Sequence, residues 1–355
     1  MHQQYFQQHV QDINQALEFY LSSWSESTNI TYPKLAPLIQ EFVTANAWGK
    51  RLRAVLVMMW YEMVTGHYHS DLLPVALAYE LFQTAILAHD DIIDISDLRR
   101  GKPTLHKAIE YRWAKDLWLW TKSWHYGVSH TICLADVGLF LANKMIVDSN
   151  LSDEIKVKAS QSFLQSCIDT WLGEILDVEL EHLDRQTITE SDIISMYRSK
   201  TAHYTITWPL LLGAICAGAD EETCKGISIF GDNLGIAFQI KDDEIGIYQD
   251  ESVSGKSATS DIIEGKYTIL YHHALQYGTS QQVDQLTSLY GHEVTTQEHQ
   301  VIKYLFEQIW SKKYCEDKVA SYVEAALEYI PYLTPHPAYR EYLHQLAAFM
   351  INRTK

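Results

Sequence analysis

The chain has 355 residues, of which 47% are hydrophobic, and a formal net charge of −17. A chain of this length can bury a substantial core, but its acidity argues against a nucleic-acid-binding groove, which needs positive surface. An anionic ligand would therefore require metal ions or a local cluster of Lys and Arg between it and the protein.

The N-terminal stretch MHQQYFQQHV has neither the basic nor the apolar region of a signal peptide. The apolar run at 208–219 is too short to cross a bilayer. The five cysteines form no CxxC pair, and their number is odd. We therefore expect a cytoplasmic protein with reduced thiols and no stable membrane insertion.

Proline and apolar spacing predict helices along most of the chain. Between residues 104 and 330 the only proline is Pro209, and proline is the main helix breaker. Apolar residues recur at intervals of three and four, as in buried helices, in the segments 70–90, 127–147, 154–180, 206–218 and 226–248. Strand-like alternation is missing. The sequence predicts one all-α domain, with breaks near 65–71, 98–104, 148–153, 183–190, 219–222, 249–260 and 331–338.

A dense acidic cluster follows the first of these helices. Asp90 and Asp94 lie four residues apart, so on a helix their carboxylates can reach one point, about 6 Å apart along the axis. A hard cation such as magnesium would relieve their repulsion. Arg99 and Arg100 follow and could donate to phosphate oxygens. The alternatives are a solvated acidic helix end and arginines that simply pair with nearby aspartates.

A second cluster of the same kind lies near residues 242–266. Asp242 and Asp243 end an apolar run, and Asp261, Lys256 and Lys266 follow. Two such clusters suggest facing walls of one pocket, in which metal ions bridge a diphosphate and lysines bind its outer oxygens.

A third basic element stands at 49–53, where the sequence is GKRLR. Lys50 and Arg53 would share a helix face, with Arg51 pointing elsewhere. Taken alone, this element is typical of a solvated basic patch.

Together these motifs resemble the trans-isoprenyl diphosphate synthases of the polyprenyl synthetase family, in particular bacterial geranylgeranyl-type enzymes. The matching pieces are GKRLR at 49–53, HDDIID at 89–94, RRG at 99–101, KTA at 200–202, FQIKDD at 238–243 and the GK…D…EGK run at 255–266. The resemblance implies a bundle of long helices around a deep central cavity, usually a homodimer. It also implies one isoprenoid synthase domain over 1–355, with a helical extension at 1–40 and a catalytic core at 41–355.

The resemblance also implies a reaction and its residues. A prenyltransferase of this family condenses isopentenyl diphosphate with an allylic diphosphate, aided by about three magnesium ions per site. The implied metal ligands are Asp90, Asp94 and Asp242, with Asp91, Asp243 and Asp261 as further candidates. Lys50, Arg53, Gln83 and Arg100 would bind isopentenyl diphosphate. Arg99, Lys200, Lys256 and Lys266 would bind the allylic diphosphate, and Lys200, Thr201 and Gln239 would act at the reacting carbons.

Some positions depart from the family pattern. The second motif lacks its third aspartate and has Gly246 there, while the usual Gly-Gln is Gly173-Glu174. In this family, residues one and two turns before the first aspartate form the floor that limits product length. Here they are Phe82, Ala85 and Ile86. A floor at Phe82, about 12 Å below Asp90, predicts geranylgeranyl diphosphate as the product.

Other functions remain open at this point. If the Phe82 side chain turns away, the product would be a longer polyprenyl diphosphate. The altered second motif would suit a non-catalytic partner subunit. A metal phosphohydrolase is suggested by His89-Asp90 but leaves the second cluster unexplained. A terpene cyclase shares the first motif but needs no isopentenyl diphosphate site, which GKRLR and RRG would provide.

Overall fold

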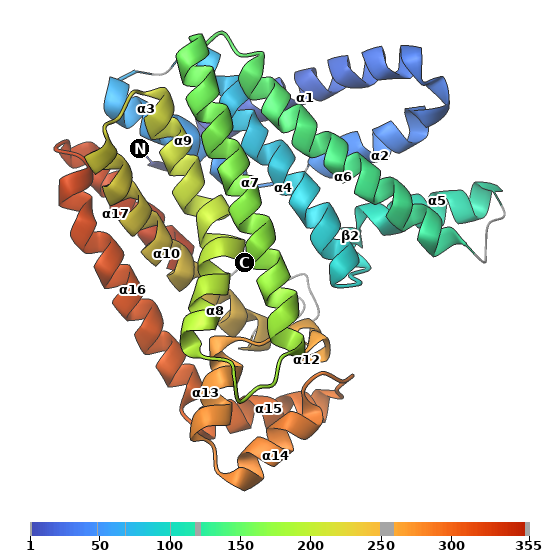
Figure 1. Cartoon of the computed structure of the whole chain (residues 1–355), viewed down its shortest axis with the longest axis vertical. Coiled ribbons are helices and arrows are strands. Elements are labelled where there is room, and N and C mark those ends of the chain that lie inside the picture. The colour runs from blue at the N-terminus through green and yellow to red at the C-terminus, as the bar shows by residue number, and fades with distance from the viewer. Residues whose placement is uncertain are drawn as a thin grey trace. The chain divides into compact units, whose positions relative to one another are not determined.

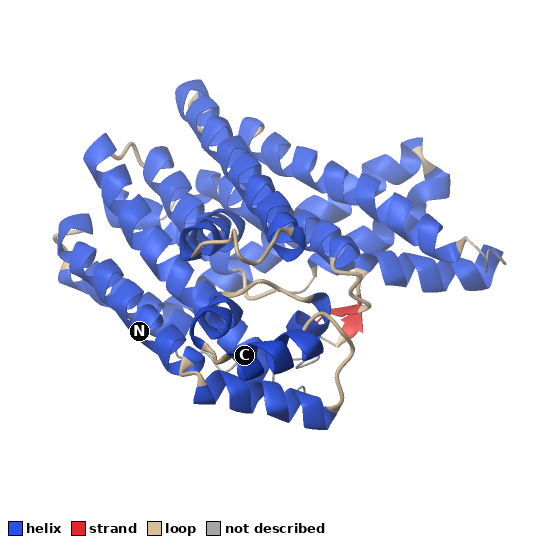
Figure 2. Cartoon of the chain, turned by 60° about the horizontal axis from the view of Figure 1, so that its bottom comes forward, coloured by secondary structure: helices blue, strands red, loops and turns tan. Residues whose placement is uncertain are grey.

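The structure is a computed structural model that describes residues 2–47, 49–67, 69–99, 101–117, 122–248 and 259–351. Helices joined by loops make up the described chain apart from two very short strands, as the blue ribbons of Figure 2 show. The prediction of an all-α protein is therefore confirmed. Contacts divide the chain into two compact units: residues 1–164 with 209–219, and residues 165–208 with 220–355.

The first unit holds the N-terminal helices, drawn from blue to green in Figure 1. Its elements are α1 (His2–Thr31), η1 (Pro33–Leu35), α2 (Ala36–Asn46), α3 (Leu52–Thr65), η2 (Ser70–Leu72), α4 (Leu73–Ile93), β1 (Leu98–Arg99), β2 (Lys102–Pro103), α5 (Leu105–Leu117), α6 (Ser123–Val147), the first part of α7 (Asp153–His182) and nearly all of α9 (Trp208–Cys216).

The second unit holds the rest of α7 and most of the C-terminal half, coloured from green through yellow to red in Figure 1. Its further elements are α8 (Glu190–Tyr197), the π-helical segment η3 (Arg198–Thr207), α10 (Glu221–Tyr248), α12 (Ser260–Glu264), α13 (Ile269–Tyr277), α14 (Ser280–Leu289), α15 (Thr296–Gln308), α16 (Ser311–Leu333) and α17 (Pro337–Ile351).

Helix α4 forms the centre of the first unit. It packs against α6 and α3 and is buried along most of its length, because it is apolar on nearly every face. Residues 70–93 and 123–147 are long and apolar enough to cross a membrane by composition alone. The first of these segments is 67% buried inside the fold, which is typical of a core helix in a water-soluble protein.

In the second unit α10 packs against α16 and η3. Segment η3 also lies very close to α7: a Cβ built on Gly173 would stand 2.2 Å from the backbone nitrogen of Lys200. Only glycine permits this approach, which brings the KTA residues of η3 against α7.

The short hairpin of β1 and β2, red in Figure 2, was not predicted. Each strand has two residues, too few to show an alternating pattern. The turn contains Gly101 with a φ of 73°, a left-handed conformation that favours glycine. Arg99 is the last residue of β1, so it lies in the hairpin that follows the first aspartate motif.

Candidate active site

The first acidic cluster forms at the C-terminal end of α4. The helix ends at Ile93 and Asp94 caps it, while the Asp94 amide still donates to the Asp90 carbonyl oxygen at 2.8 Å. Asp90 and Asp94 therefore keep the one-turn spacing that the sequence predicted. Both are half-buried, whereas Asp91 is buried.

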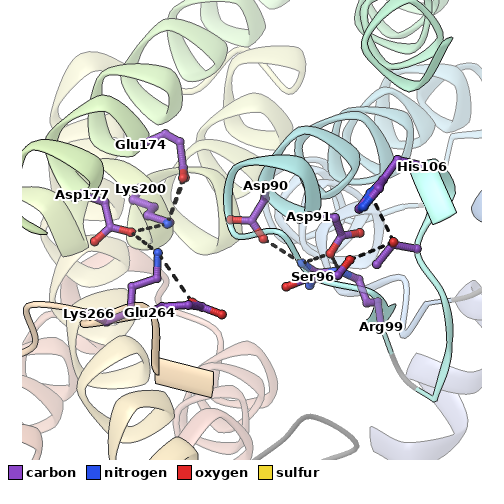
Figure 3. Close-up of polar contacts among 11 residues, drawn as sticks. Asp90, Asp91, Ser96, Arg99, His106, Glu174, Asp177, Lys200, Glu264 and Lys266 are labelled. Carbon is purple, nitrogen blue, oxygen red and sulfur yellow. Dashed lines mark hydrogen bonds and ion pairs between the residues drawn. The ribbon is translucent and has the colours of Figure 1, made fainter. Parts of the chain in front are cut away.

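Arg99 binds this cluster directly, as the right-hand group of Figure 3 shows. Its guanidinium donates to Asp90 Oδ2 and Asp91 Oδ1, each at 2.7 Å. Burial alone would lower the pKa of Arg99, but the neighbouring carboxylates of Asp91 and Asp90 outweigh it and raise that pKa. The arginine thus pairs with Asp90 and Asp91. Asp97, two residues before it, instead has its Oδ1 atom 3.1 Å from Lys107 Nζ.

The loop that carries Arg99 is fixed by Thr104. The Thr104 hydroxyl donates to the Ser96 carbonyl oxygen at 2.9 Å, and the Thr104 amide donates to that of Asp97 at 3.0 Å. These bonds close the loop between α4 and α5. The guanidinium is therefore held beside the aspartates by the local backbone as well as by charge.

The GKRLR element differs from its prediction in one respect. Helix α3 begins at Leu52, so Lys50 precedes the helix and shares no helix face with Arg53. The reason is Arg51, which takes a left-handed conformation and buries its side chain. It pairs with Glu80 at 3.3 Å and donates to Asn14 Oδ1 at 2.7 Å, so Arg51 does point elsewhere, into the core of the first unit.

The side chains that were predicted to bind isopentenyl diphosphate differ in how far they are exposed. Lys50 is exposed, while Arg53 and Gln83 are half-buried. Gln83 Oε1 is buried without a hydrogen-bond partner among the described residues. Arg100 lies outside the described residues, as does Lys256 of the second cluster.

A cluster of lysines and carboxylates lies on the second unit, at the left of Figure 3. Lys200 Nζ stands 3.0 Å from Glu174 Oε2 and 2.5 Å from Asp177 Oδ2. Lys266 Nζ lies 3.4 Å from the same Asp177 oxygen and 3.0 Å from Glu181 Oε1. The α7 carboxylates thus hold together the two lysines that the sequence assigned to one diphosphate.

Asp177 is the centre of this lysine cluster. Burial would raise the pKa of its carboxyl, but Lys200 and Lys266 overcome that effect and lower the pKa below its ordinary value. Glu174, Asp177 and Glu181 were not predicted from the sequence as partners of these lysines. Their spacing of three and four along one helix was the available signal.

The second aspartate motif lies within α10, which ends at Tyr248, where the helical segment predicted at 226–248 also ends. Asp242 is exposed, and Asp243 is buried. Consecutive helical residues point about 100° apart, so one carboxylate faces outward and the next inward. The Asp243 carboxylate accepts hydrogen bonds from Tyr197 and Gln239, and burial raises its pKa well above the usual value. Asp243 is therefore bound within the unit.

Asp261 explains the missing third aspartate of the motif. A Cβ built on Gly246 would lie 2.4 Å from Asp261 Oδ2, so the carboxylate of Asp261, on α12, occupies the space beside Gly246. A longer side chain at 246 would displace it. Glu244, in the same motif, forms an ion pair with Lys241 at 2.9 Å.

The product-length candidates lie on one stripe of α4 below Asp90. Phe82 is fully buried and packs edge-on against Tyr79 and Phe163, with ring centroids 6.2 and 5.7 Å away. Ile86 is 5% exposed, and Ala85 lies beside Gly138 of α6. Phe163, on α7 but within the first unit, was missed because no local pattern marks it.

The donor set fits a hard divalent cation. Asp90 and Asp94 provide only oxygen ligands, and the position beside Asp90 and Asp91 already stabilises a positive group, the Arg99 guanidinium. Among the described residues, no group of three His, Cys, Asp or Glu side chains is arranged to hold a metal by itself. A diphosphate would then supply the remaining oxygens, as is usual for magnesium.

The polyprenyl synthetase model matches residues 36–309 of this sequence. The chain belongs to the polyprenyl synthetase family. The prediction of a prenyltransferase is confirmed at the level of this family. One family model spans both compact units, yet the division into an extension and a core stays a prediction.

Individual members of the polyprenyl synthetase family resemble the chain over most of its length. Geranylgeranyl diphosphate synthase of Methanosarcina mazei is 29% identical over 310 residues, 87% of either chain. A short chain isoprenyl diphosphate synthase of Methanothermobacter thermautotrophicus is 30% identical over 326 residues, 92% of either chain.

Solved structures agree with these sequence relatives. Geranylgeranyl pyrophosphate synthase of Corynebacterium glutamicum, complexed with isoprenyl diphosphate and magnesium, has a TM-score of 0.87 and 28% identity. It covers 96% of this chain, which covers 98% of it. The chain therefore has the isoprenoid synthase fold.

Proposed function

We propose that this polyprenyl synthetase condenses isopentenyl diphosphate with an allylic diphosphate to give geranylgeranyl diphosphate. The observation that carries the proposal is the aspartate cluster at the end of α4, where Asp90 and Asp91 bind a cationic group. Relatives named as geranylgeranyl diphosphate synthases support the product.

The two acidic clusters would act on one substrate. Asp90 and Asp94 from α4 and Asp242 from α10 would hold magnesium on the allylic diphosphate, with Asp261 contributing from beside Gly246. Arg99, Lys200 and Lys266 would bind its oxygens, and Lys256 is proposed for the same role. Lys50, Arg53, Gln83 and Arg100 would bind isopentenyl diphosphate. When bound, magnesium would neutralise the leaving diphosphate.

These residues would promote ionisation without a protein acid. Lys200 and Lys266 are held in place by Asp177, so their charges are positioned before the allylic C–O bond breaks. Thr201 and Gln239 would face the resulting cation. Holding both substrates side by side supplies proximity, and excluding water prevents capture of the cation. The departing diphosphate would accept the final proton.

Product length would be limited by the rings below Asp90. Phe82 is proposed as the floor, with Tyr79 and Phe163 packed around it, and Ala85 and Ile86 as the wall above. Three interlocked aromatic rings resist displacement better than one.

The chain is further proposed to act as a cytoplasmic homodimer. Leu164, Ile168, Leu172 and Ile175 form an exposed apolar stripe along α7, each about half exposed or more. Such a stripe, with spacings of four, four and three, is typical of a helix that packs against another copy.

The direct test incubates purified protein with magnesium, isopentenyl diphosphate and one of three allylic primers: dimethylallyl, geranyl or farnesyl diphosphate. The proposal predicts a 20-carbon product by mass spectrometry, and none in Asp90→Asn. A longer product would favour a longer-chain synthase, whereas no product from any primer would favour a non-catalytic partner subunit.

A further inference from the structure

Tyr197, the last residue of α8, connects three elements of the second unit. It is 1% exposed, and its hydroxyl accepts a hydrogen bond from the Ile269 amide of α13 at 3.0 Å. The same hydroxyl donates to Asp243 Oδ2 on α10. A phenol can do both at once, whereas a phenylalanine could do neither. The residue directly before η3 is therefore tied to the second aspartate motif.

Asp243 also accepts a hydrogen bond from Gln239, which lies one helical turn earlier on α10. Its second oxygen, Oδ1, accepts from Gln239 Nε2 at 2.7 Å. Both carboxylate oxygens of Asp243 are thus engaged inside the unit, while Asp242 beside it is exposed. Asp243 was a candidate metal ligand from the sequence, but its contacts indicate a different role.

The bond to Asp243 fixes which end of the Gln239 amide points where. Because the NH₂ end donates to the carboxylate, the carbonyl oxygen is directed away from Asp243. An amide oxygen carries partial negative charge and stabilises a positive charge placed next to it. A freely rotating amide would present its NH₂ group, which repels a cation, for part of the time.

We propose that Asp243 and Tyr197 are positioning residues that hold the Gln239 carbonyl oxygen toward the allylic cation. The inference rests on the proposed function, in which Gln239 faces the reacting carbons. Asp243 then contributes to the rate of ionisation through Gln239, and the metal is bound by Asp242.

An exchange of the two side chains tests this role. In Asp243→Asn the new NH₂ group cannot accept from Gln239, so the glutamine loses its orientation. In Gln239→Glu two carboxylates oppose each other. The double variant D243N/Q239E restores the pair: the asparagine oxygen accepts from Tyr197, its NH₂ group donates to the glutamate, and the total charge is unchanged.

The expected signature is a loss in kcat, because the orienting group acts on the transition state. Each single variant should lower kcat by about tenfold to a hundredfold, with the KM for the allylic diphosphate and the magnesium requirement nearly unchanged. The double variant should recover at least half of that loss on a logarithmic scale. Asp284→Asn, an exposed residue of α14, should leave kcat unchanged.

Two results would overturn the inference. One is a raised KM and magnesium requirement in Asp243→Asn, which would make Asp243 a metal ligand. The other is a double variant no faster than the singles. If Asp243→Asn fails to fold in a thermal melt, full kcat in Gln239→Glu alone would also overturn it. Absence of any product from the wild type would instead refute the proposed function.

Discussion

Gly246 and Asp261 form a contact that can be exchanged residue for residue. In Gly246→Asp the new side chain would meet the carboxylate of Asp261, which lies where its Cβ must go. Overpacking and like-charge repulsion should destabilise the fold by about 2 kcal/mol and lower kcat/KM. Chemical denaturation and steady-state kinetics measure both effects.

The double variant G246D/D261G provides the control for that experiment. It should recover stability relative to the single variant, because one carboxylate again occupies the space. A Gly246→Asp protein as stable and active as the wild type would show that Asp261 does not need this position.

Phe82 allows a second test by substitution of single residues. Phe82→Ala should lengthen the product by one or more five-carbon units, because the ring beneath the α4 stripe is removed, and should cost about 3 kcal/mol of stability. Phe163→Ala should act in the same direction. Mass spectrometry of the products measures the length.

Phe306, fully buried in the second unit, is the matched control. Phe306→Ala should cost similar stability without changing the product length. An unchanged product in both Phe82→Ala and Phe163→Ala would show that the three rings do not limit product length.

Among the secondary-structure elements, α7 carries the carboxylate that organises Lys200 and Lys266. The lowered pKa of Asp177 means that its stabilising effect is complete above the unfolded pKa, about 3.9. The effect is lost as the pH falls through the lower, folded pKa, because the unfolded chain takes up the proton first. Asp177→Asn should therefore cost about 3 kcal/mol at pH 7, and less near pH 3.

Denaturant unfolding of wild type and variant at both pH values measures this difference. Exposed Asp153, at the start of α7, is the control, and Asp153→Asn should change stability little. An equal loss at both pH values would mean that Asp177 stabilises the fold by packing and not by charge.

Several core helices were predictable from the sequence, because apolar spacing of three and four indicates that a helix is buried. It located α4, α6, α7, α9 and α10. Contacts made across the chain were not predictable in the same way. The left-handed turn at Arg51, the inward turn of Asp243 and the ring of Phe163 each depend on a partner many residues away.

The oligomeric state of the whole molecule can be tested by substitution on the α7 stripe. Replacing Ile168 and Leu172 together by Glu should convert a dimer to a monomer, because charges would enter an apolar interface. Size-exclusion chromatography with light scattering gives the mass directly. Leu183→Glu, an exposed apolar residue beyond the end of α7, is the control and should leave the mass unchanged. A wild-type monomer would contradict the homodimer.

Asp90 and Asp242 are proposed to bind one diphosphate through shared magnesium. Calorimetric titration measures this binding, with an unreactive allylic thiolodiphosphate added to wild type, Asp90→Asn, Asp242→Asn and the double variant. Removing magnesium or either aspartate should raise Kd by at least about tenfold. The double variant should lose less binding free energy than the two single variants together. Wild-type affinity and magnesium dependence in either single variant would contradict this proposal.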